Sequence, residues 1–212
     1  MSRRERQRAD TQAELLKAAH ELVRNGGYDG LTIRKLAEKV GYAPMSVYSY
    51  FADKQAILEA IAQDIFVELA RQADENEPED PMEAVRHGMR GYAAFGLANA
   101  NEYRTIFMTE KVHEHDGDKV QELRESNPAF QGLLRCVEKA IVAGQLRGDA
   151  MAISTILWTV AHGAVSLVLT FPGYPFGDPH DYVSRVVDLT LAGMKDNDVA
   201  LLSDAPTACS VA

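Results

Sequence analysis

Apolar residues recur at helical spacing along most of this 212-residue chain, and this periodicity limits the possible folds more than any other feature. In the first such segment, Leu15, Ala18, Ala19, Leu22 and Val23 follow an i, i+3, i+4, i+7, i+8 pattern, which places them on one face of a helix. No segment alternates apolar and polar residues as a half-buried strand would. The sequence therefore predicts an all-α fold.

Capping and turn residues divide the first third of the chain into four helices. The first is expected to end at residues 25–27, Asn-Gly-Gly, and Thr32 can cap the second. Gly41 can end this second helix because glycine tolerates the left-handed conformation. Pro44 suits the first position of a very short third helix, and Asp53 suits the N-cap of a fourth. Two helices joined by so short a turn are typical of a helix-turn-helix.

Five further helices are predicted after an acidic segment that contains two prolines, residues 74–81. Their expected ranges are 82–99, 101–112, 128–144, 150–171 and 179–194. The chain is thus expected to contain four regions. These are a basic arm with the helix-turn-helix (1–55), a connecting helix with an acidic linker (56–80), a second helical domain (81–196) and a disordered tail (197–212).

The net charge of −9 conceals an asymmetry between two parts of the chain. Residues 1–55 carry ten Lys or Arg and seven Asp or Glu, whereas residues 56–212 carry 12 and 24. Four arginines lie among the first eight residues, and such an arm either neutralises nucleic-acid phosphates or is merely a solvated tail. An acidic remainder would repel DNA and so direct the basic part toward it.

Cysteine content and the N-terminal sequence indicate a soluble cytoplasmic protein. Cys136 and Cys209 are too few and too far apart for a zinc ribbon or a disulfide framework, and no apolar stretch follows the N-terminal charges. The most apolar segment, residues 153–171, is interrupted by Ser, Thr and His. We interpret it as a buried helix and expect no membrane partner.

Residues 31–58 have the sequence LTIRKLAEKVGYAPMSVYSYFADKQAIL, and residues 18–30 have the sequence AAHELVRNGGYDG. Both stretches resemble the DNA-binding region of the TetR (tetracycline-repressor-like) family of bacterial transcriptional regulators, and the spacing of so many residue types makes the match specific. The resemblance implies a homodimer that binds a palindromic operator in double-stranded DNA and responds to a small-molecule effector. Repression is the family's usual mode, and activation stays open.

The resemblance also implies which residues lie at the DNA. The matched positions are Thr32, Arg34, Ala43, Pro44, Met45, Ser46, Tyr48, Ser49, Tyr50 and Lys54. Ala43 departs from the family, which often has Ser or Thr there, so a helix cap and a phosphate contact are lost. Tyr50 is alternatively a core aromatic, as we expect for Phe51.

Base recognition would have an apolar and a polar component. Pro44 and Met45 lack hydrogen-bonding side chains, so part of it would depend on contact with thymine methyl groups. The polar contacts would come from Arg34, Ser46 and Tyr48, and the shape of the DNA would contribute to specificity.

Residues 158–163, Trp-Thr-Val-Ala-His-Gly, resemble the Trp-His-Gly signature of one TetR C-terminal subfamily. The spacing places Trp158 above His162 on one helical face, and Gly163 would permit close helix approach. This pair is either a pocket wall or a structural buried pair. The expected ligand-binding residues are Tyr92, Phe95, Tyr103, Phe107, Met108, Trp158 and His162. They suggest an apolar or aromatic effector, although such residues also form ordinary core.

The resemblance assigns the homodimer interface to the last two helices. Their apolar faces exceed what one amphipathic surface helix needs, which favours burial against a partner. The expected interface residues are Leu157, Val165, Val168, Val183, Val186, Val187, Leu189 and Leu191.

Other sites and functions have less support. Residues 113–116, His-Glu-His-Asp, could coordinate a metal, but a solvated loop is the preferred interpretation because a distant fourth ligand is lacking. Cys136 is expected to be a small buried hydrophobe. The chain has no Gly-rich phosphate loop, zinc-protease pair or nucleophile elbow, so we expect no enzyme, no cofactor and no metal. The alternatives are an enzyme on a helical fold and an interaction module that no longer binds DNA.

Overall fold

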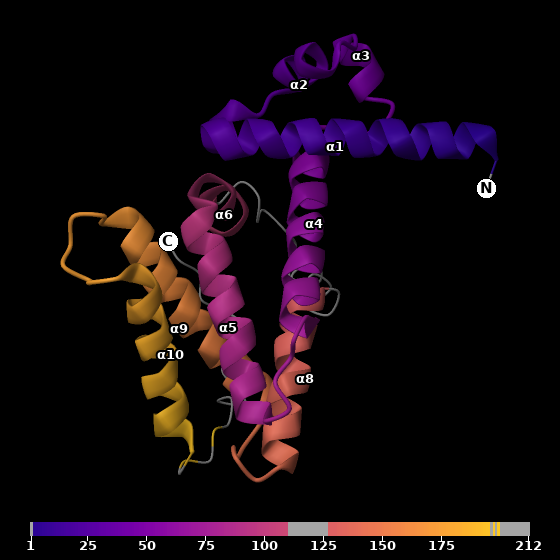
Figure 1. Cartoon of the computed structure of the whole chain (residues 1–212). Coiled ribbons are helices and arrows are strands. Elements are labelled where there is room, and N and C mark those ends of the chain that lie inside the picture. The colour runs from indigo at the N-terminus through magenta and orange to yellow at the C-terminus, as the bar shows by residue number, and fades with distance from the viewer. Residues whose placement is uncertain (1, 110–126, 196, 198, 200–212) are drawn as a thin grey trace, which may run out of the picture. The chain divides into compact units, whose positions relative to one another are not determined.

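The computed structural model describes residues 2–109, 127–195, 197 and 199 (Figure 1). Its helices are α1 (Arg3–Gly30), α2 (Ile33–Val40), α3 (Pro44–Val47), α4 (Lys54–Asp74), α5 (Pro81–Ala98), α6 (Ala100–Phe107), α8 (Pro128–Val142), α9 (Ala150–Thr170) and α10 (Pro179–Met194). Within these described residues there is no β-strand, and one isolated bridge joins Gly148 to Val199. The predicted all-α fold is confirmed.

The predicted caps of the early helices are confirmed by their hydrogen bonds. The Thr32 hydroxyl accepts a bond of 3.1 Å from the Lys35 amide at the start of α2. Gly41 ends α2 with a φ of 73°, the left-handed conformation that favours glycine. The Asp53 carboxylate accepts a bond of 2.8 Å from the Ala56 amide at the start of α4. These boundaries follow from local chemistry, which is why the sequence predicts them.

Helix α1 begins earlier and ends later than the apolar periodicity predicts. The Ser2 hydroxyl accepts from the Glu5 amide at 3.2 Å, and the Glu5 carboxylate accepts from the Ser2 amide at 2.6 Å. This reciprocal capping box closes the N-terminus of the helix, so the arginine-rich arm is helical. At the other end, Gly27 interrupts the helix with a φ of 61°, but one further turn continues to Gly30.

The contacts divide the chain into two compact units, which we call unit 1 (Met1–Arg71 and Ala94–Ala129) and unit 2 (Gln72–Ala93 and Phe130–Ala212). This division differs from the four regions expected from composition. Helix α6 belongs with α1 because it packs against that helix through a buried face that includes Tyr103 and Ile106. Sequence composition does not reveal this pairing because the two helices are far apart along the chain.

The core of unit 1 fixes the helix-turn-helix against α1. Helix α2 packs on α1, and α3 packs on α2 (Figure 1). Leu15 of α1, Leu36 of α2, Val47 of α3 and Ile57 of α4 are completely buried. These side chains hold α2 and α3 by their inner faces and leave the outer faces exposed.

The core of unit 2 lies between α5, α8, α9 and α10. Helices α9 and α10 pack directly against each other (Figure 1). Buried residues of this core include Val85, Val137, Ile153, Leu157 and Leu191. Part of the apolar surface of α9 is therefore buried within one subunit.

Most of the residues expected at the dimer interface are buried within one subunit. The core residues of one subunit include Leu157, Val165, Val168, Val183, Val187 and Leu191, all at most 9% exposed. A side chain already buried in its own subunit has almost no surface left to bury against a second copy. Of the expected set, Val186 is half-buried and Leu189 is 68% exposed.

Among the described helices, α9 alone has the length and apolar composition to cross a membrane. Its most apolar 18 residues have a mean hydropathy of 1.7, and 44% of that segment is buried inside the protein. The core helix of a soluble protein passes the same test.

Candidate nucleic-acid interface and ligand site

Helix α3 presents an exposed surface that is anchored from behind. Val47 and Phe51 are buried, whereas Met45 is 77% exposed and Tyr48 is 50% exposed. The predicted core role of Phe51 and the outward placement of Tyr48 are confirmed. Ala43 is the N-cap of α3 and makes no side-chain hydrogen bond, so the start of this helix has no side-chain cap, as the sequence predicts.

Eight of the ten predicted DNA-contact residues are exposed. They are Thr32, Arg34, Ala43, Pro44, Met45, Ser46, Tyr48 and Ser49. They come from the start of α2, the turn, and α3 with its C-terminal end, so the fold gathers them in the helix-turn-helix. The remaining two, Tyr50 and Lys54, are half-buried.

Lys54 is held within unit 1 by Tyr28. Its Nζ donates a hydrogen bond of 2.7 Å to the Tyr28 carbonyl and lies 3.4 Å from the centroid of the Tyr28 ring. The family resemblance places Lys54 among the DNA-contact positions, but these contacts also use its ammonium to join α4 to the end of α1.

An ion pair and a hydrogen bond link α2 and its turn to α1. Lys39 Nζ lies 2.8 Å from the Glu21 carboxylate, and the Tyr42 hydroxyl donates to Glu14 at 3.4 Å. The hydrogen bond and the positive charge of Lys39 lower the pKa of Glu21 below its ordinary value. The lowered pKa means that this contact persists on acidification to a lower pH than an ordinary glutamate would allow.

Arg8, one of the four arginines of the N-terminal arm, makes contacts that the sequence does not predict. Its guanidinium donates to the Ser49 carbonyl at 2.8 Å and lies 5.5 Å from the centroid of the Tyr50 ring. These contacts join residues 41 positions apart. Helical spacing carries no signal for such a pair.

A second group of candidate residues lies within unit 2. The Tyr92 hydroxyl and His162 Nδ1 share a hydrogen bond of 3.1 Å, and His162 Nε2 lies 3.4 Å from the Ser166 hydroxyl. The Trp158 and His162 ring centroids lie 6.0 Å apart with the rings tilted by 43°, so the predicted placement of this pair on one helical face is confirmed. Phe130 of α8 meets Trp158 edge-on at 6.4 Å. Helices α5, α8 and α9 thus contribute aromatic surface around one polar imidazole.

Sequence reasoning overlooks Ser166 and Phe130. Ser166 stands four residues after His162, so helical spacing could have identified it. Phe130 has no such signal. The close helix approach expected at Gly163 is wrong within a subunit, because a Cβ there would meet none of the described atoms within 4 Å.

The other expected ligand residues lie in unit 1. They are Phe95, Tyr103, Phe107 and Met108. Tyr103 is completely buried, and its ring centroid lies 4.9 Å from that of Phe107, which in turn lies 5.8 Å from that of Phe66. Tyr103 is therefore a core aromatic and has no free surface for a ligand.

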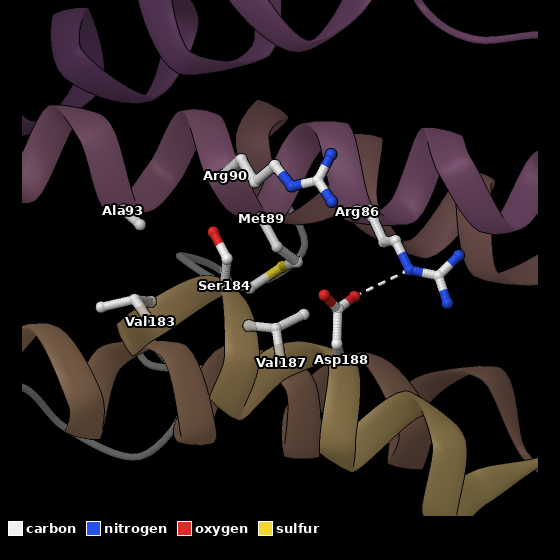
Figure 2. A pocket seen from close by; sticks show the side chains of 8 residues that line it. All are labelled: Arg86, Met89, Arg90, Ala93, Val183, Ser184, Val187 and Asp188. Carbon is white, nitrogen blue, oxygen red and sulfur yellow. Dashed lines mark hydrogen bonds and ion pairs between the residues drawn. The ribbon is translucent and has the colours of Figure 1, made fainter. Parts of the chain in front are cut away.

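A small cavity lies between α5 and α10 in unit 2 (Figure 2). Its lining residues are Arg86, Met89, Arg90, Ala93, Val183, Ser184, Val187 and Asp188. Its volume is about 10 Å³, which is room for no more than one water molecule. Arg86 Nε donates to Asp188 at 2.8 Å beside it, so this cavity is a packing feature of the α5–α10 contact.

The metal and cysteine candidates do not add a site. The His-Glu-His-Asp segment, residues 113–116, lies outside the described residues. The part of the chain that the structure does describe contains no group of three His, Cys, Asp or Glu residues able to hold a metal ion. Cys136 is half-buried, and its burial raises the pKa of the thiol.

The sequence and fold match known regulators. The family model described as "Bacterial regulatory proteins, tetR family" matches residues 15–61, and the model described as "Tetracyclin repressor-like, C-terminal domain" matches residues 85–190. The tetracycline repressor protein class A from transposon 1721 of Escherichia coli is 26% identical over 156 residues, which span 73% of this chain and 64% of that protein. The HTH-type transcriptional repressor AcnR of Corynebacterium glutamicum is 25% identical over 196 residues, 89% of this chain and 95% of that protein.

A solved structure supports the same fold. RolR in complex with resorcinol superposes with a TM-score of 0.68 at 19% identity, covering 90% of each chain.

The matched families contain regulators and not enzymes. Since the C-terminal family model spans half of the chain and the N-terminal model covers the helix-turn-helix, the protein belongs to the tetR family of bacterial regulatory proteins.

Proposed function

We propose that the protein is a ligand-responsive transcriptional repressor that binds a palindromic operator in double-stranded DNA as a homodimer. The observation that carries this proposal is the exposed outer face of α3, with Met45 and Tyr48 displayed while Val47 is buried behind them. A short helix held in this way can enter the major groove and bring side chains to base edges. Action on chromosomal DNA would place the protein in the cytoplasm.

The two kinds of DNA contact would come from different parts of unit 1. Met45 would meet thymine methyl groups, and Tyr48 would supply both ring surface and a hydroxyl. Backbone phosphates would be met by the Thr32 end of α2 and by the exposed arginines in the first turns of α1. Those arginines are Arg3, Arg4 and Arg6.

Exposed apolar residues on α9 and α10 support dimerisation. Ile156 and Leu167 of α9 and Leu189 of α10 all retain large exposed surfaces. Exposed apolar surface of this kind favours association, and a twofold interface would use the same patch on both subunits. Dimerisation would set the two recognition helices about 34 Å apart, the spacing of half-sites in successive major grooves.

The effector would bind at the aromatic surface around His162. Trp158 is 40% exposed in the subunit, and Phe130 and Tyr92 border the same part of unit 2. We propose a planar apolar or aromatic molecule with a hydroxyl or carbonyl group that hydrogen-bonds to the imidazole. RolR, which has the same fold, has been solved with the small aromatic resorcinol.

Ligand binding would act by a population shift. A ligand could prefer a form of the dimer in which the distance between the two helix-turn-helix units does not match the operator. Such a ligand would lower the population of the DNA-binding form. Its differential affinity for the two forms limits the size of the response.

The DNA-binding proposal can be tested by selecting bound duplexes from a random pool with purified protein. We expect the wild type to enrich a palindrome, and its binding to weaken steeply as salt is added. Tyr48→Ala should lose the enrichment. Tyr174→Ala is the matched control, because Tyr174 is also an exposed tyrosine but stacks on Phe176 in the loop between α9 and α10. No enriched sequence from a folded wild-type dimer would contradict the proposal.

The effector site can be tested through intrinsic fluorescence because the chain contains one tryptophan. A panel of phenols and aromatic carboxylates should include compounds that change the Trp158 emission in a saturable way and weaken operator binding over the same concentration range. His162→Ala should weaken both effects. A compound that releases DNA equally well from the wild type and His162→Ala would place the effector elsewhere.

A further inference from the structure

Helix α3 contains little that fixes its own orientation. It has four residues, and Ala43 provides no side-chain cap at its start. So short a helix contributes few internal hydrogen bonds, so its position depends on its neighbours. The buried Val47 and Phe51 hold its inner side, which leaves the outer residues at its C-terminal end to be fixed by other contacts.

Arg8 of α1 holds this end through two consecutive residues. Its Nη2 donates to the Ser49 carbonyl at 2.8 Å, and its guanidinium carbon lies 5.5 Å from the Tyr50 ring centroid. Both residues directly follow Tyr48, the C-cap of α3. One side chain thus constrains the backbone and a ring immediately after the exposed reading surface.

The chemistry of arginine suits both contacts at once. A guanidinium is planar and has five donors, so it can hydrogen-bond to a carbonyl while lying near an aromatic ring. Helix α1 gives Arg8 a rigid base, because the Ser2–Glu5 capping box closes that helix two turns earlier. A lysine at this position could make one contact well but could not present a planar group to the ring.

We propose that Arg8 is a positioning residue for operator recognition, fixing the C-terminal end of α3 so that Tyr48 meets the base edges in one orientation. This rests on the proposed function, in which α3 reads DNA. Sequence-specific binding requires that orientation, whereas non-specific binding depends mainly on charge. Loss of Arg8 therefore lowers affinity for the operator much more than affinity for unrelated DNA.

Arg4 offers a matched control for the charge of Arg8. It lies four residues earlier on the same face of α1 and is exposed. Arg4→Ala removes the same charge without touching Ser49 or Tyr50. A difference between the two variants therefore reports the contacts of Arg8 and not its charge.

The test measures affinity for the selected operator and for an unrelated duplex over a salt series. Arg8→Ala is expected to bind the operator about tenfold more weakly, the effect of losing one specific contact, while its non-specific affinity and salt slope fall no further than those of Arg4→Ala, which loses the same charge. Arg8→Lys should fall between this variant and the wild type. Arg4→Ala should weaken both kinds of binding equally and lower the salt slope by about one if it meets a phosphate.

Hydrogen exchange in the free protein gives a second readout. The amides of Tyr50 and Phe51 both donate to the Val47 carbonyl, and these bonds should open more often in Arg8→Ala. The amides of α2 should exchange as in the wild type, which also shows that the variant is folded.

The outcomes separate this proposal from the function on which it rests. If the wild type enriches an operator and Arg8→Ala binds it within twofold of the wild type, the positioning role is wrong and the function stands. Equal losses on operator and unrelated DNA, with a reduced salt slope, would make Arg8 a phosphate contact and also overturn it. If the folded wild type enriches no sequence, the function itself fails.

Discussion

The carboxylate of Glu102 on α6 shares a hydrogen bond of 3.0 Å with His20 Nδ1 on α1, although Glu102 is only 2% exposed. Arg24 of α1 also donates to this carboxylate, with Nε at 3.2 Å. His20 Nε2 lies 3.5 Å from Asp64 of α4, so three helices of unit 1 meet at one imidazole. Burial raises the pKa of Glu102, but the bonds from His20 and Arg24 outweigh it and the pKa lies below its ordinary value.

Replacing this carboxylate should destabilise unit 1 and change its response to acid. At neutral pH, Glu102→Gln should lower the free energy of unfolding by about 1–3 kcal/mol, because it weakens charge-assisted bonds in a buried place. Since the folded-state pKa of Glu102 is lowered, its contribution is complete above the ordinary glutamate pKa of about 4.3 and is lost as the pH falls through the folded-state pKa.

Urea unfolding across that pH range can check this expectation. The wild type should lose stability on acidification more steeply than Glu102→Gln. Glu38→Gln, an exposed change on α2, serves as the control and should follow the wild type. Identical pH profiles for the wild type and Glu102→Gln would contradict the assigned role of the pair.

Substitutions of two leucines of α10 should distinguish a residue of the subunit core from a residue of the proposed dimer interface. Leu191 is completely buried, so Leu191→Ala should lower the free energy of unfolding by about 2–5 kcal/mol. Leu189 is 68% exposed, so Leu189→Ala should change it by less than about 0.5 kcal/mol but weaken the proposed dimer. Unfolding at one fixed protein concentration and sedimentation velocity give the two quantities. A dimer unaffected by Leu189→Ala would remove this residue from the interface.

A cap can be restored at the start of α3. Ala43 has the extended conformation of an N-cap but no acceptor, so Ala43→Ser should stabilise the protein by about 0.5–1 kcal/mol. The new hydroxyl should also raise operator affinity if it meets a phosphate. Thermal unfolding and operator titration measure these effects, with Ala43→Val as the control that supplies no acceptor. Equal melting temperatures for the two variants would contradict the capping argument.

Arg86 allows a tertiary ion pair to be compared with a local one. Its Nε donates to Asp188 of α10 at 2.8 Å, whereas its Nη1 donates to Glu83 of the same helix at 2.8 Å (Figure 2 shows the first pair). Asp188→Ala should cost about 1 kcal/mol because it removes a bond between α5 and α10. Glu83→Ala should cost at most about 0.5 kcal/mol, as expected for an exposed pair within a helix. Chemical denaturation that ranks the two variants in the opposite order would refute this comparison.

Residue type and spacing were enough to predict the caps of the early helices and the outer face of the helix-turn-helix. Thr32, Gly41 and Asp53 act within one turn of their own position, so residue type and spacing suffice to predict them. The exposure of Tyr48 follows similarly from the inward direction of its neighbour Val47. These relationships involve residues close together along the chain, so they can be predicted from the sequence.

Tertiary structure alone decided what covers each apolar face and which distant side chains meet. Periodicity shows that α9 and α10 have apolar faces, but not that Leu157 and Leu191 are buried within one subunit. The contacts of Arg8 with Ser49 and of His20 with Glu102 join residues 41 and 82 positions apart, and no short-range pattern encodes such pairs. They depend on how helices pack in space, because side-chain direction and helix position become fixed together only when the core forms.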